Sequence, residues 1–491
     1  TLYMAFYTIS HVVKKMEKKE GLESINDEFY DFVFLGKEPA AVGSGRAGHR
    51  KIPSEWDEAR REFLYWYPLD SSHSAHDLVH NHLTYFVFNH TAVFSEKQAG
   101  PDGFIPASHF WPKQTVSNGF VTMEGKKMSK SMGNILPLRK AIAQYGTDVI
   151  RFVVTSSAEL EADSDFNQAA ADGVISRINV LESYLQKTIS EGKKAGDEKT
   201  RKTSTRPSAR SKTPASRSRP TRWFYSRLHQ RVRDAASQYE NFQLRPLAKA
   251  LLYDTVNDLQ WYARRAGSAG EMDLREFFEY WALLANPFMP HVAGEFWERL
   301  GAKKHVPSSP LAVSAPFPPA DGERIDPMLE MGEQYLLSLI EDMRHILALI
   351  KNEKPASISL IVHSPWKMNV RALVAAHKNI KSVMEEAKKD AALSKRMGAV
   401  SALAAKFAKN IGSITGVTLD AKEEMDVLTD AKEFLSAEFG GARIEVLREE
   451  DAPPELAAKA SNALPGKPSI FVGPTEPTSA PASRPGTGAG A

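Results

Sequence analysis

The chain has 491 residues, of which 42% are hydrophobic and 25% are charged, and its formal net charge is +3. This length leaves room for about three domains of roughly 150 residues, and the composition excludes a wholly disordered, collagen-like or repeat protein. No run of 18 apolar residues occurs, so we expect no membrane span. The chain contains no cysteine, which excludes disulfides and thiol nucleophiles and is compatible with the cytoplasm, the location that we expect.

The first third of the chain mixes short apolar segments of two kinds. Residues 2–13 and 78–94 are predicted as largely apolar helices. Residues 120–123 and 149–155 are predicted as strands, because they are short apolar runs bounded by glycine or turn residues. The mixture indicates an α/β fold for this part.

The basic charge is concentrated in one segment. From Lys193 to Arg222 there are eleven Lys or Arg residues and two acids, a net charge of +9, so the rest of the chain carries −6. The segment is rich in Ser, Thr and Pro and has almost no apolar residue, which predicts a disordered insert over 193–221. It serves either as a solvated linker or as an arm that binds RNA phosphates, and Lys199, Arg201 and Lys202 are its candidate contacts.

The rest of the chain is predicted to be mainly helical, with a small mixed domain at the end. Apolar residues recur at helical spacing from about 223 to 300, with breaks at 267–270 and 287–290, which predicts a helical bundle. A Pro-rich connector follows at 307–321. Residues 328–350 then form a long amphipathic helix, and 358–362 and 442–446 are predicted as strands of an α+β domain.

The strongest local signal is the sequence EGKKMSKSMGN at residues 124–134. Lys127 and Lys130 flank a Met128–Ser129 pair, and Ser131 follows, so the loop offers two cations and two hydroxyl donors. Such a loop suits a triphosphate, whose β and γ phosphates gain charge as pyrophosphate leaves. Gly125 and Gly133 allow the backbone to approach the phosphates.

Residues 127–131 match the KMSKS signature of the class I aminoacyl-tRNA synthetases, and the surrounding sequence resembles the archaeal-type leucyl-tRNA synthetases. The segments that carry this resemblance lie at 66–70, 73–83, 88–90, 118–119, 145–151, 163–166, 222–223, 227–228, 257–262, 287–291, 448–452 and 463–468. They extend over nearly the whole chain except the basic insert and the last twenty or so residues.

The resemblance implies roles for individual residues. Lys127 and Lys130 would hold the triphosphate of ATP, with Lys130 stabilising the transition state of adenylate formation. Met128, Ser129 and Ser131 complete this ATP-binding loop. Asp77 falls where the family places a carboxylate on the ATP ribose, and His82 falls on a histidine of the leucine pocket.

The chain departs from the family at several of these positions. Ala75, at a close approach to the nucleotide, replaces the usual glycine, and Met132 replaces a residue that is often lysine. His73-Ser74-Ala75-His76 imitates the His-Ile-Gly-His signature. However, it lies only 54 residues before Lys127, whereas that signature lies hundreds of residues ahead in the family, so we do not assign it. His73, His76 and His80 share a helical spacing, but without cysteine and with one nearby acid we predict no protein metal site.

The resemblance implies a multidomain fold of α/β and α type, with the boundaries that follow. They are 1–157, the second half of a class I nucleotide-binding, Rossmann-like catalytic domain; 158–192 with 222–306, a helical-bundle anticodon-binding domain; 193–221, the basic insert; 307–324, the connector; 325–472, a C-terminal α+β domain that binds tRNA; and 473–491, a disordered tail.

The expected function is that of a leucine–tRNA ligase, which uses ATP with Mg²⁺ to form leucyl-adenylate and then leucyl-tRNA(Leu). No His-Ile-Gly-His signature occurs in the chain, so the first half of the catalytic domain and the editing domain are expected to be absent. The chain would then be a truncated sequence or one subunit of a split enzyme with a separate N-terminal catalytic and editing subunit. Arg264 and Arg265, beside Trp261 and Tyr262, are further candidate tRNA contacts, while the two aromatic residues are expected to be buried.

Two alternatives remain open. The same loop also occurs in synthetases for methionine, valine or isoleucine. A non-catalytic tRNA-binding module, or a decayed half-enzyme, would keep the RNA-binding domains and lack the activity.

Overall fold

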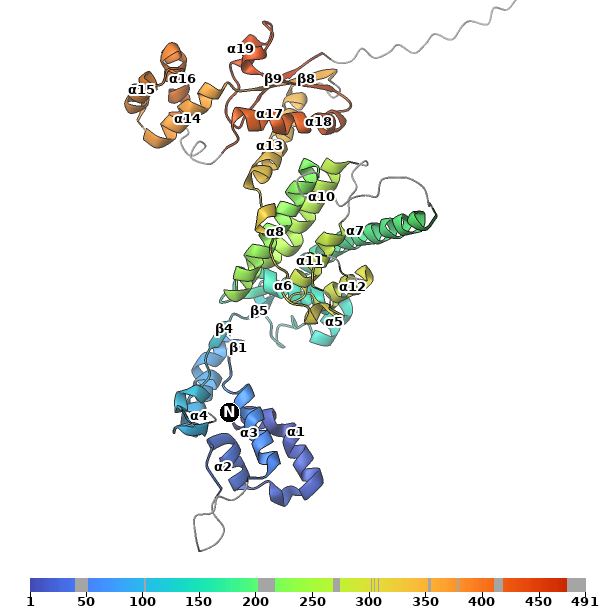
Figure 1. Ribbon diagram of the computed structural model, residues 1–491, viewed down its shortest axis with the longest axis vertical. Coiled ribbons are helices and arrows are strands. Elements are labelled where there is room, and N and C mark those ends of the chain that lie inside the picture. Colours follow the sequence, from blue (N-terminus) through green and yellow to red (C-terminus); the bar gives the residue numbers. More distant parts are fainter. Residues whose placement is uncertain are drawn as a thin grey trace, which may run out of the picture. The chain divides into compact units, whose positions relative to one another are not determined.

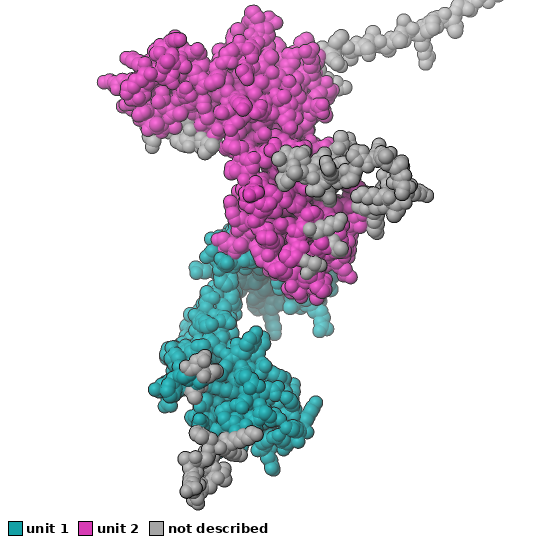
Figure 2. Space-filling model, in the orientation of Figure 1, with its two compact units in different colours: residues 1–178, 238–249 teal, residues 179–237, 250–491 magenta. Residues whose placement is uncertain are grey.

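The computed structural model describes residues 1–39, 52–100, 103–201, 217–267, 274–301, 303, 305–307, 309–351, 355–377, 379–409 and 418–474, with the backbone alone for 99 and 192–201. The chain divides into two compact units (Figure 2). The first comprises residues 1–178 with 238–249, and the second comprises residues 179–237 with 250–491. None of the described helices is long and apolar enough to cross a membrane.

Three helices form the first core of unit 1: α1 (Leu2–Glu20), α2 (Asp27–Leu35) and α3 (Ser54–Trp66) (Figure 1). On α1, Ala5, Ile9, Val12 and Met16 are buried at helical spacing. They pack in one hydrophobic cluster with residues of the other two helices, Phe29 and Phe63 among them. The helix predicted over 2–13 is confirmed, and it continues further because Met16 extends the buried face.

A parallel pair of strands follows this helical core. Strand β1 (Ser72–Ala75) pairs with β4 (Thr115–Asn118) in the register Ser72↔Thr115. Between them lie a 3₁₀ turn, η2 (His76–Leu78), a π-helical turn, η3 (Val79–Leu83), and helix α4 (Thr84–Val93). The helix predicted over 78–94 is therefore confirmed, although it begins with irregular turns. A short antiparallel pair, β2 (Gln98–Gly100) and β3 (Gly103–Ile105), completes this region.

A second small sheet carries the lysine-rich loop. Its strand order is β6-β5-β7, from Lys126–Lys127, Val121–Met123 and Ser164–Phe166, with β5 antiparallel to β6 and parallel to β7. The strand predicted over 120–123 is confirmed. Between β6 and β7 lie α5 (Leu138–Tyr145) and α6 (Thr147–Ser157).

The strand predicted over 149–155 is wrong, because these residues belong to α6. Val149, Phe152 and Val153 are buried there at spacings of three and four, which is the period of a helix. The run is short and rich in β-branched residues, so its composition favoured a strand while its burial follows a helix. Tertiary packing of this face decides the outcome.

Unit 2 contains the predicted helical bundle. Its helices are α8 (Arg219–Glu240, which ends in unit 1), α10 (Thr255–Ala266), α11 (Arg275–Ala285) and α12 (Pro290–Leu300). The Phe224 ring stacks on Tyr262 at 4.7 Å between centroids and contacts Phe277 at 5.2 Å. The predicted break at 287–290 separates α11 from α12, and residues 268–273 lie outside the described part.

The end of unit 2 is an α+β domain, as predicted. The long helix α13 (Pro327–Ile350) begins with Asp326, whose side chain accepts a hydrogen bond from the Met328 N–H. Strand β8 (Ser357–Val362) lies between β9 (Arg443–Arg448), which is parallel to it, and β10 (Ser469–Val472), which is antiparallel. The remaining helices of this domain are α14 (Pro365–His377), α15 (Ile380–Lys389), α16 (Met397–Ala408), α17 (Ala421–Asp430), α18 (Lys432–Glu438) and α19 (Ala457–Ala460).

The start of the basic segment differs from the sequence prediction. Helix α7 (Gln168–Arg201) continues into it, so the backbone of residues 193–201 is helical rather than irregular. Lysine, glutamate and alanine in this stretch are good helix formers and extend the helix that starts at Gln168. Residues 202–216 and 475–491 lie outside the described residues, and with them most of the insert and nearly all of the predicted tail.

Candidate functional site

The lysine-rich loop starts from a tight hairpin. Strands β5 and β6 pair Thr122 with Lys127 and Met123 with Lys126, so two residues form the turn. Both turn residues, Glu124 (φ 50°) and Gly125 (φ 72°), have positive φ, as a type I′ turn requires. The hairpin therefore places Lys127 at a defined position on the sheet.

Asp165 of β7 holds this hairpin. Its Oδ1 accepts a hydrogen bond from the Gly125 N–H and another from the Thr122 hydroxyl, both at 2.7 Å. These bonds, first that from Gly125 and then that from Thr122, stabilise the carboxylate and lower the pKa of Asp165. The turn is thus fixed to the neighbouring strand by a charged acceptor.

Asn134 closes the other end of the loop. Its Oδ1 accepts a hydrogen bond from the Ser129 N–H at 2.9 Å, and its Nδ2 donates to the Lys127 carbonyl at 3.1 Å. The hydroxyl oxygens of Ser129 and Ser131 lie 2.7 Å apart. The loop is therefore a closed turn that presents two adjacent hydroxyls.

The two lysines of the loop are exposed. The Lys127 Nζ lies 4.7 Å from the centre of the Phe120 ring. For Lys130, no hydrogen bond or ion pair of the side chain is present among the residues that the structure describes. Two ammonium groups without a carboxylate partner, next to two hydroxyls, form a group of donors that suits a polyphosphate.

Phe120 connects this loop to the segment after β1. The His76 ring also contacts Phe120, at 4.4 Å between centroids and an interplanar angle of 72°. Ala75 ends β1, where it pairs with Asn118, and Asp77 lies in η2 directly after His76. The structure therefore places His76 and Lys127 against the same Phe120 ring, and Ala75 and Asp77 are the chain neighbours of His76.

The carbonyl of Ala162 explains why a glycine follows Asn118. A Cβ on Gly119 would lie 2.2 Å from that carbonyl oxygen, so any side chain there would force the backbone apart. The Gly119 N–H donates to the Leu160 carbonyl at 3.2 Å. This close approach holds β4 and β5 against the segment that leads into β7.

The predicted leucine-pocket residue lies elsewhere in unit 1. His82 is exposed in η3, with its ring 6.4 Å from that of Phe86. Within the described residues, no hydrogen bond, ion pair or ring contact joins it to the loop. Among these residues there is also no group of three or more His, Asp or Glu side chains that could hold a metal ion.

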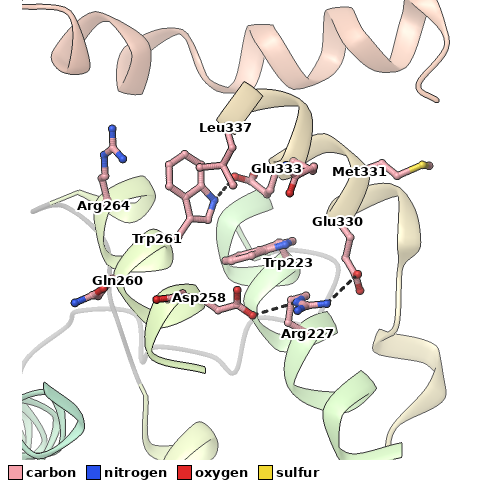
Figure 3. A pocket seen from close by; sticks show the side chains of 12 residues that line it. Trp223, Arg227, Asp258, Gln260, Trp261, Arg264, Glu330, Met331, Glu333 and Leu337 are labelled. Carbon is pink, nitrogen blue, oxygen red and sulfur yellow. Dashed lines mark hydrogen bonds and ion pairs between the residues drawn. The ribbon is translucent and has the colours of Figure 1, made fainter. Parts of the chain in front are cut away.

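A second candidate site is a cleft of about 650 Å³ in unit 2 (Figure 3). It is lined by α8, α10 and α13, and Trp223, Trp261 and several charged residues face it. Arg227 binds Asp258 at 3.1 Å and Glu330 at 3.2 Å. Burial opposes the charge on Arg227, but these two carboxylates raise its pKa. The charges of the cleft therefore largely satisfy one another.

The predicted tRNA contacts near this cleft differ in availability. The Arg265 side chain is 2% exposed and binds Glu333 at 2.9 Å and Asp430 at 3.2 Å. The Arg264 side chain is 37% exposed, lies over the Trp261 ring and is bound by Glu438. Trp261 and Tyr262 are buried, as predicted.

The candidate contacts in the basic segment cannot be placed in the same way. The side chains of Lys199 and Arg201 are not described, although their backbone belongs to α7. Lys202 lies outside the described residues.

Sequence reasoning gave no role to three residues that shape the loop. Phe120 supports Lys127, Asn134 closes the loop, and Asp165 holds the hairpin. Asn134 had a signal, because it follows Gly133 directly at the end of the lysine-rich sequence. Asp165 had a weaker one, as a carboxylate between Ser164 and Phe166 in a short alternating run.

Family models match two parts of the chain. The model described as "Anticodon-binding domain of tRNA ligase" matches residues 221–362, and "tRNA synthetases class I (M)" matches residues 49–181. The second match contains the whole lysine-rich loop. The first contains α10, α11, α12 and α13 and all of α8 except its first two residues.

Curated relatives match nearly the full chain. It is 31% identical over 481 residues to a leucine–tRNA ligase of Pyrococcus horikoshii, which covers 96% of this chain and 45% of the relative. It is 33% identical over 475 residues to that of Methanocaldococcus jannaschii, with 96% and 44% covered. The chain thus spans less than half the length of these relatives.

Proposed function

Since this chain belongs to the archaeal-type leucyl-tRNA synthetases, of which it spans less than half the length, we propose that it is the part of a leucine–tRNA ligase that carries the lysine-rich loop and the tRNA-binding domains. The region of residues 1–157 acts as the second half of a class I nucleotide-binding domain. The bundle and the C-terminal α+β domain bind tRNA(Leu). The enzyme acts in the cytoplasm.

The lysine loop is the observation that carries this proposal. Lys127 and Lys130 are exposed, and Ser129 and Ser131 offer adjacent hydroxyls 2.7 Å apart. Asp165 and Asn134 hold the two ends of the loop, so the donors are positioned before a ligand arrives. Preorganised donors of this kind stabilise charge that develops during a reaction.

In the first step, a carboxylate oxygen of leucine attacks the α-phosphorus of ATP. The new P–O bond forms as the bond to the β-phosphate oxygen breaks, and pyrophosphate leaves with its added charge. Lys130 and Lys127 bind that leaving group, and Asp77 accepts hydrogen bonds from the ribose hydroxyls. Mg²⁺ bound to ATP would supply further neutralisation of the phosphate charge, while the residues of this chain bind and orient the nucleotide.

In the second step, a hydroxyl at the 3′ end of the tRNA attacks the leucyl carbonyl and AMP leaves. No side chain of this chain forms a covalent bond with the substrate, so the rate enhancement comes from positioning and electrostatics. His82 contributes to the leucine pocket when the remaining wall of that pocket is present.

The missing wall is a second polypeptide or a preceding part of the same protein. Edge strands leave backbone groups unpaired, and two strands alone are only marginally stable, yet β1 and β4 form a pair with no third strand among the described residues. Val79, Tyr85 and Phe88, on and before α4, are large apolar side chains exposed to solvent. Exposed apolar surface of this kind indicates an interface.

The test is leucine-dependent exchange between ATP and pyrophosphate. It is measured for this chain alone, and for this chain mixed with a polypeptide that carries the part of the relatives' length absent here. We expect no exchange alone and exchange on mixing. Persistent silence after mixing, with a demonstrated complex, would contradict the proposal.

The same test distinguishes two other functions. The match to the class I (M) model favours a methionine enzyme as the second candidate; exchange that depends on methionine, valine or isoleucine rather than leucine would support such an enzyme. A non-catalytic tRNA-binding module would bind tRNA(Leu) and show no exchange with any amino acid.

A further inference from the structure

Helix α1 carries a line of residues on its exposed side. Tyr3, Tyr7, His11, Lys14 and Lys18 follow one another at spacings of four, four, three and four residues. At about 100° per residue, these positions lie within about 80° of one another around the helix axis. They are opposite the side of α1 that is buried in the core of unit 1. We call this set the α1 stripe.

The first half of the α1 stripe is aromatic. The Tyr3 and Tyr7 residues are 75% and 67% exposed, and their ring centroids are 6.0 Å apart at an interplanar angle of 44°. Within the described residues, neither hydroxyl makes a hydrogen bond. Two adjacent rings that protrude into solvent have free faces on which another planar group can stack.

The second half of the α1 stripe is cationic. An open recess of about 450 Å³ is lined by His11, Lys14, Lys15, Lys18 and Lys19. Lys15 is bound by Glu58, and Lys19 by Glu55 and Glu20. For Lys14 and Lys18, no ion pair is present in the part of the chain that the structure describes.

We propose that the α1 stripe binds single-stranded RNA, with bases stacked on Tyr3 and Tyr7 and backbone phosphates on Lys14 and Lys18. This combination of aromatic platforms and aligned cations is how proteins hold single strands without reading their sequence. The inference rests on the proposed function, since the tRNA 3′ end would be the RNA strand presented to unit 1.

The lysines favour RNA over a protein partner on this surface. Tyrosine is common in both kinds of interface, but lysine is depleted in the buried centre of protein interfaces. Two lysines without a carboxylate partner would be costly to bury against another polypeptide. Against phosphates, the same two groups gain affinity by releasing counterions.

The experiment uses the full chain and a 12-nucleotide single strand that contains 4-thiouridine. After photo-crosslinking, the crosslinked peptides are mapped by mass spectrometry, which separates α1 from the basic insert. We expect crosslinks within residues 1–20. The variant Tyr3→Ala/Tyr7→Ala should reduce them about 10-fold or more, because stacking on each ring is lost, whereas Tyr3→Phe/Tyr7→Phe should retain them.

A separate measurement tests the cationic half of the α1 stripe. The logarithm of the α1 crosslink yield should fall with the logarithm of salt concentration, and the variant Lys14→Gln/Lys18→Gln should make this negative slope shallower by about 1.4, at about 0.7 per phosphate contact. The charge-retaining variant Lys14→Arg/Lys18→Arg should keep the slope. Tyr65→Ala, which removes another exposed tyrosine of unit 1, should change neither measurement.

Two results would overturn the inference: no crosslinks in residues 1–20, or crosslinks that both alanine and glutamine variants leave unchanged. Unchanged crosslinks together with weaker binding of the complementary polypeptide would make the α1 stripe a protein interface instead. Exchange of ATP with pyrophosphate needs no RNA, so the stripe variants should leave it intact. Failure of exchange in the unsubstituted mixture would count against the proposed function alone.

Discussion

Lys127 and Lys130 in unit 1 reach solvent without a carboxylate partner among the described residues, whereas Arg227 and Arg265 in unit 2 are each bound by carboxylates. Both regions are clusters of basic residues beside aromatic rings. In the loop, the neighbours of the lysines are backbone groups, hydroxyls and Phe120. In the cleft, the neighbours of the arginines are Glu330, Glu333 and other acids, which neutralise them.

The difference shows that the availability of a cation depends on its partners rather than on its residue type. A buried and paired arginine stabilises the packing of helices, and breaking the pair leaves an uncompensated charge. An exposed and unpaired lysine contributes little to stability and remains free to bind an anion. Substitutions in the two regions should therefore change different properties.

The largest expected effect is the loss of stability caused by Arg265→Ala. It leaves the Glu333 carboxylate, 1% exposed, without its ion pair, which should cost about 3–5 kcal/mol in the free energy of unfolding of unit 2. The neighbouring Arg264→Ala is the matched control and should cost less than about 1 kcal/mol, because the Arg264 side chain is 37% exposed and Arg344 still pairs with Glu438. Urea unfolding, monitored by amide hydrogen exchange in α10 and α13, measures the stability loss of both variants. Equal losses of unfolding free energy in the two variants would contradict the difference between buried and exposed arginines.

Lys130→Ala should have the opposite profile. Removal of one charge-stabilising donor typically lowers a rate by about 100-fold or more, so leucine-dependent exchange in the reconstituted complex should fall by that factor. The free energy of unfolding of the chain should change by less than about 0.5 kcal/mol. Lys126→Ala, an exposed lysine in the same hairpin, should leave exchange unchanged. A stability loss in Lys130→Ala would show that this lysine is structural.

Acid should weaken unit 2 through Glu276. Burial opposes the charge on this carboxylate, but nearby His229 and Arg324 lower its pKa to about 2. Because the pKa is lower in the folded state than in the unfolded state, the stabilisation is present above about pH 4.5 and is lost as the pH falls towards 2. Glu276→Gln should remove this loss of stability at low pH, which is on the order of 2 kcal/mol. Melting temperatures measured over a series of pH values check this. Glu323→Gln, in the exposed turn η8 (Gly322–Arg324), should keep it.

Asn134→Ala should produce the smallest effect. It removes the acceptor of the Ser129 N–H and the donor to the Lys127 carbonyl. Each hydrogen bond contributes about 1 kcal/mol, so a less ordered loop should lower exchange about 10-fold with little change in the stability of unit 1. Asn134→Asp keeps an acceptor for Ser129 and should retain intermediate activity. A loss as large as that of Lys130→Ala would assign Asn134 a direct role.

Much of the fold could be predicted from local periodicity. The helices at 2–13 and 328–350 and the strands at 358–362 and 442–446 are present, because one apolar face, or a continuous apolar run, sets each of them. Residues 149–155 could not be assigned in this way, since a short β-branched run fits both periods. The helical burial of Val149, Phe152 and Val153 depends on packing that no local window contains.

The sequence was enough to predict the residues of the lysine-rich loop, but not the residues that hold the loop in place. Lys127, Ser129, Lys130 and Ser131 are contiguous, so their sequence was enough to propose the loop. Asp165 is 40 residues from the Gly125 that it binds, and only the pairing of β5 with β7 brings them together. The burial of Arg265 beside the exposed Arg264 likewise depends on α13, which lies far along the chain. The roles proposed for Asp77, Ala75 and His82 remain predictions.

Helix α13 contacts two parts of unit 2 that are expected to bind different regions of one RNA. Glu330 and Glu333 near its start bind arginines of α8 and α10, and the Tyr335 hydroxyl donates to Glu424 of α17 at 3.1 Å. With 24 residues, the helix is about 36 Å long at 1.5 Å per residue. The contacts of Glu333 and Tyr335 are only two residues apart on this helix, about 3 Å along its axis. One residue inserted between them would rotate the second contact by about 100° relative to the first, so we expect the helical register at this point to fix how the bundle and the C-terminal domain face a common RNA.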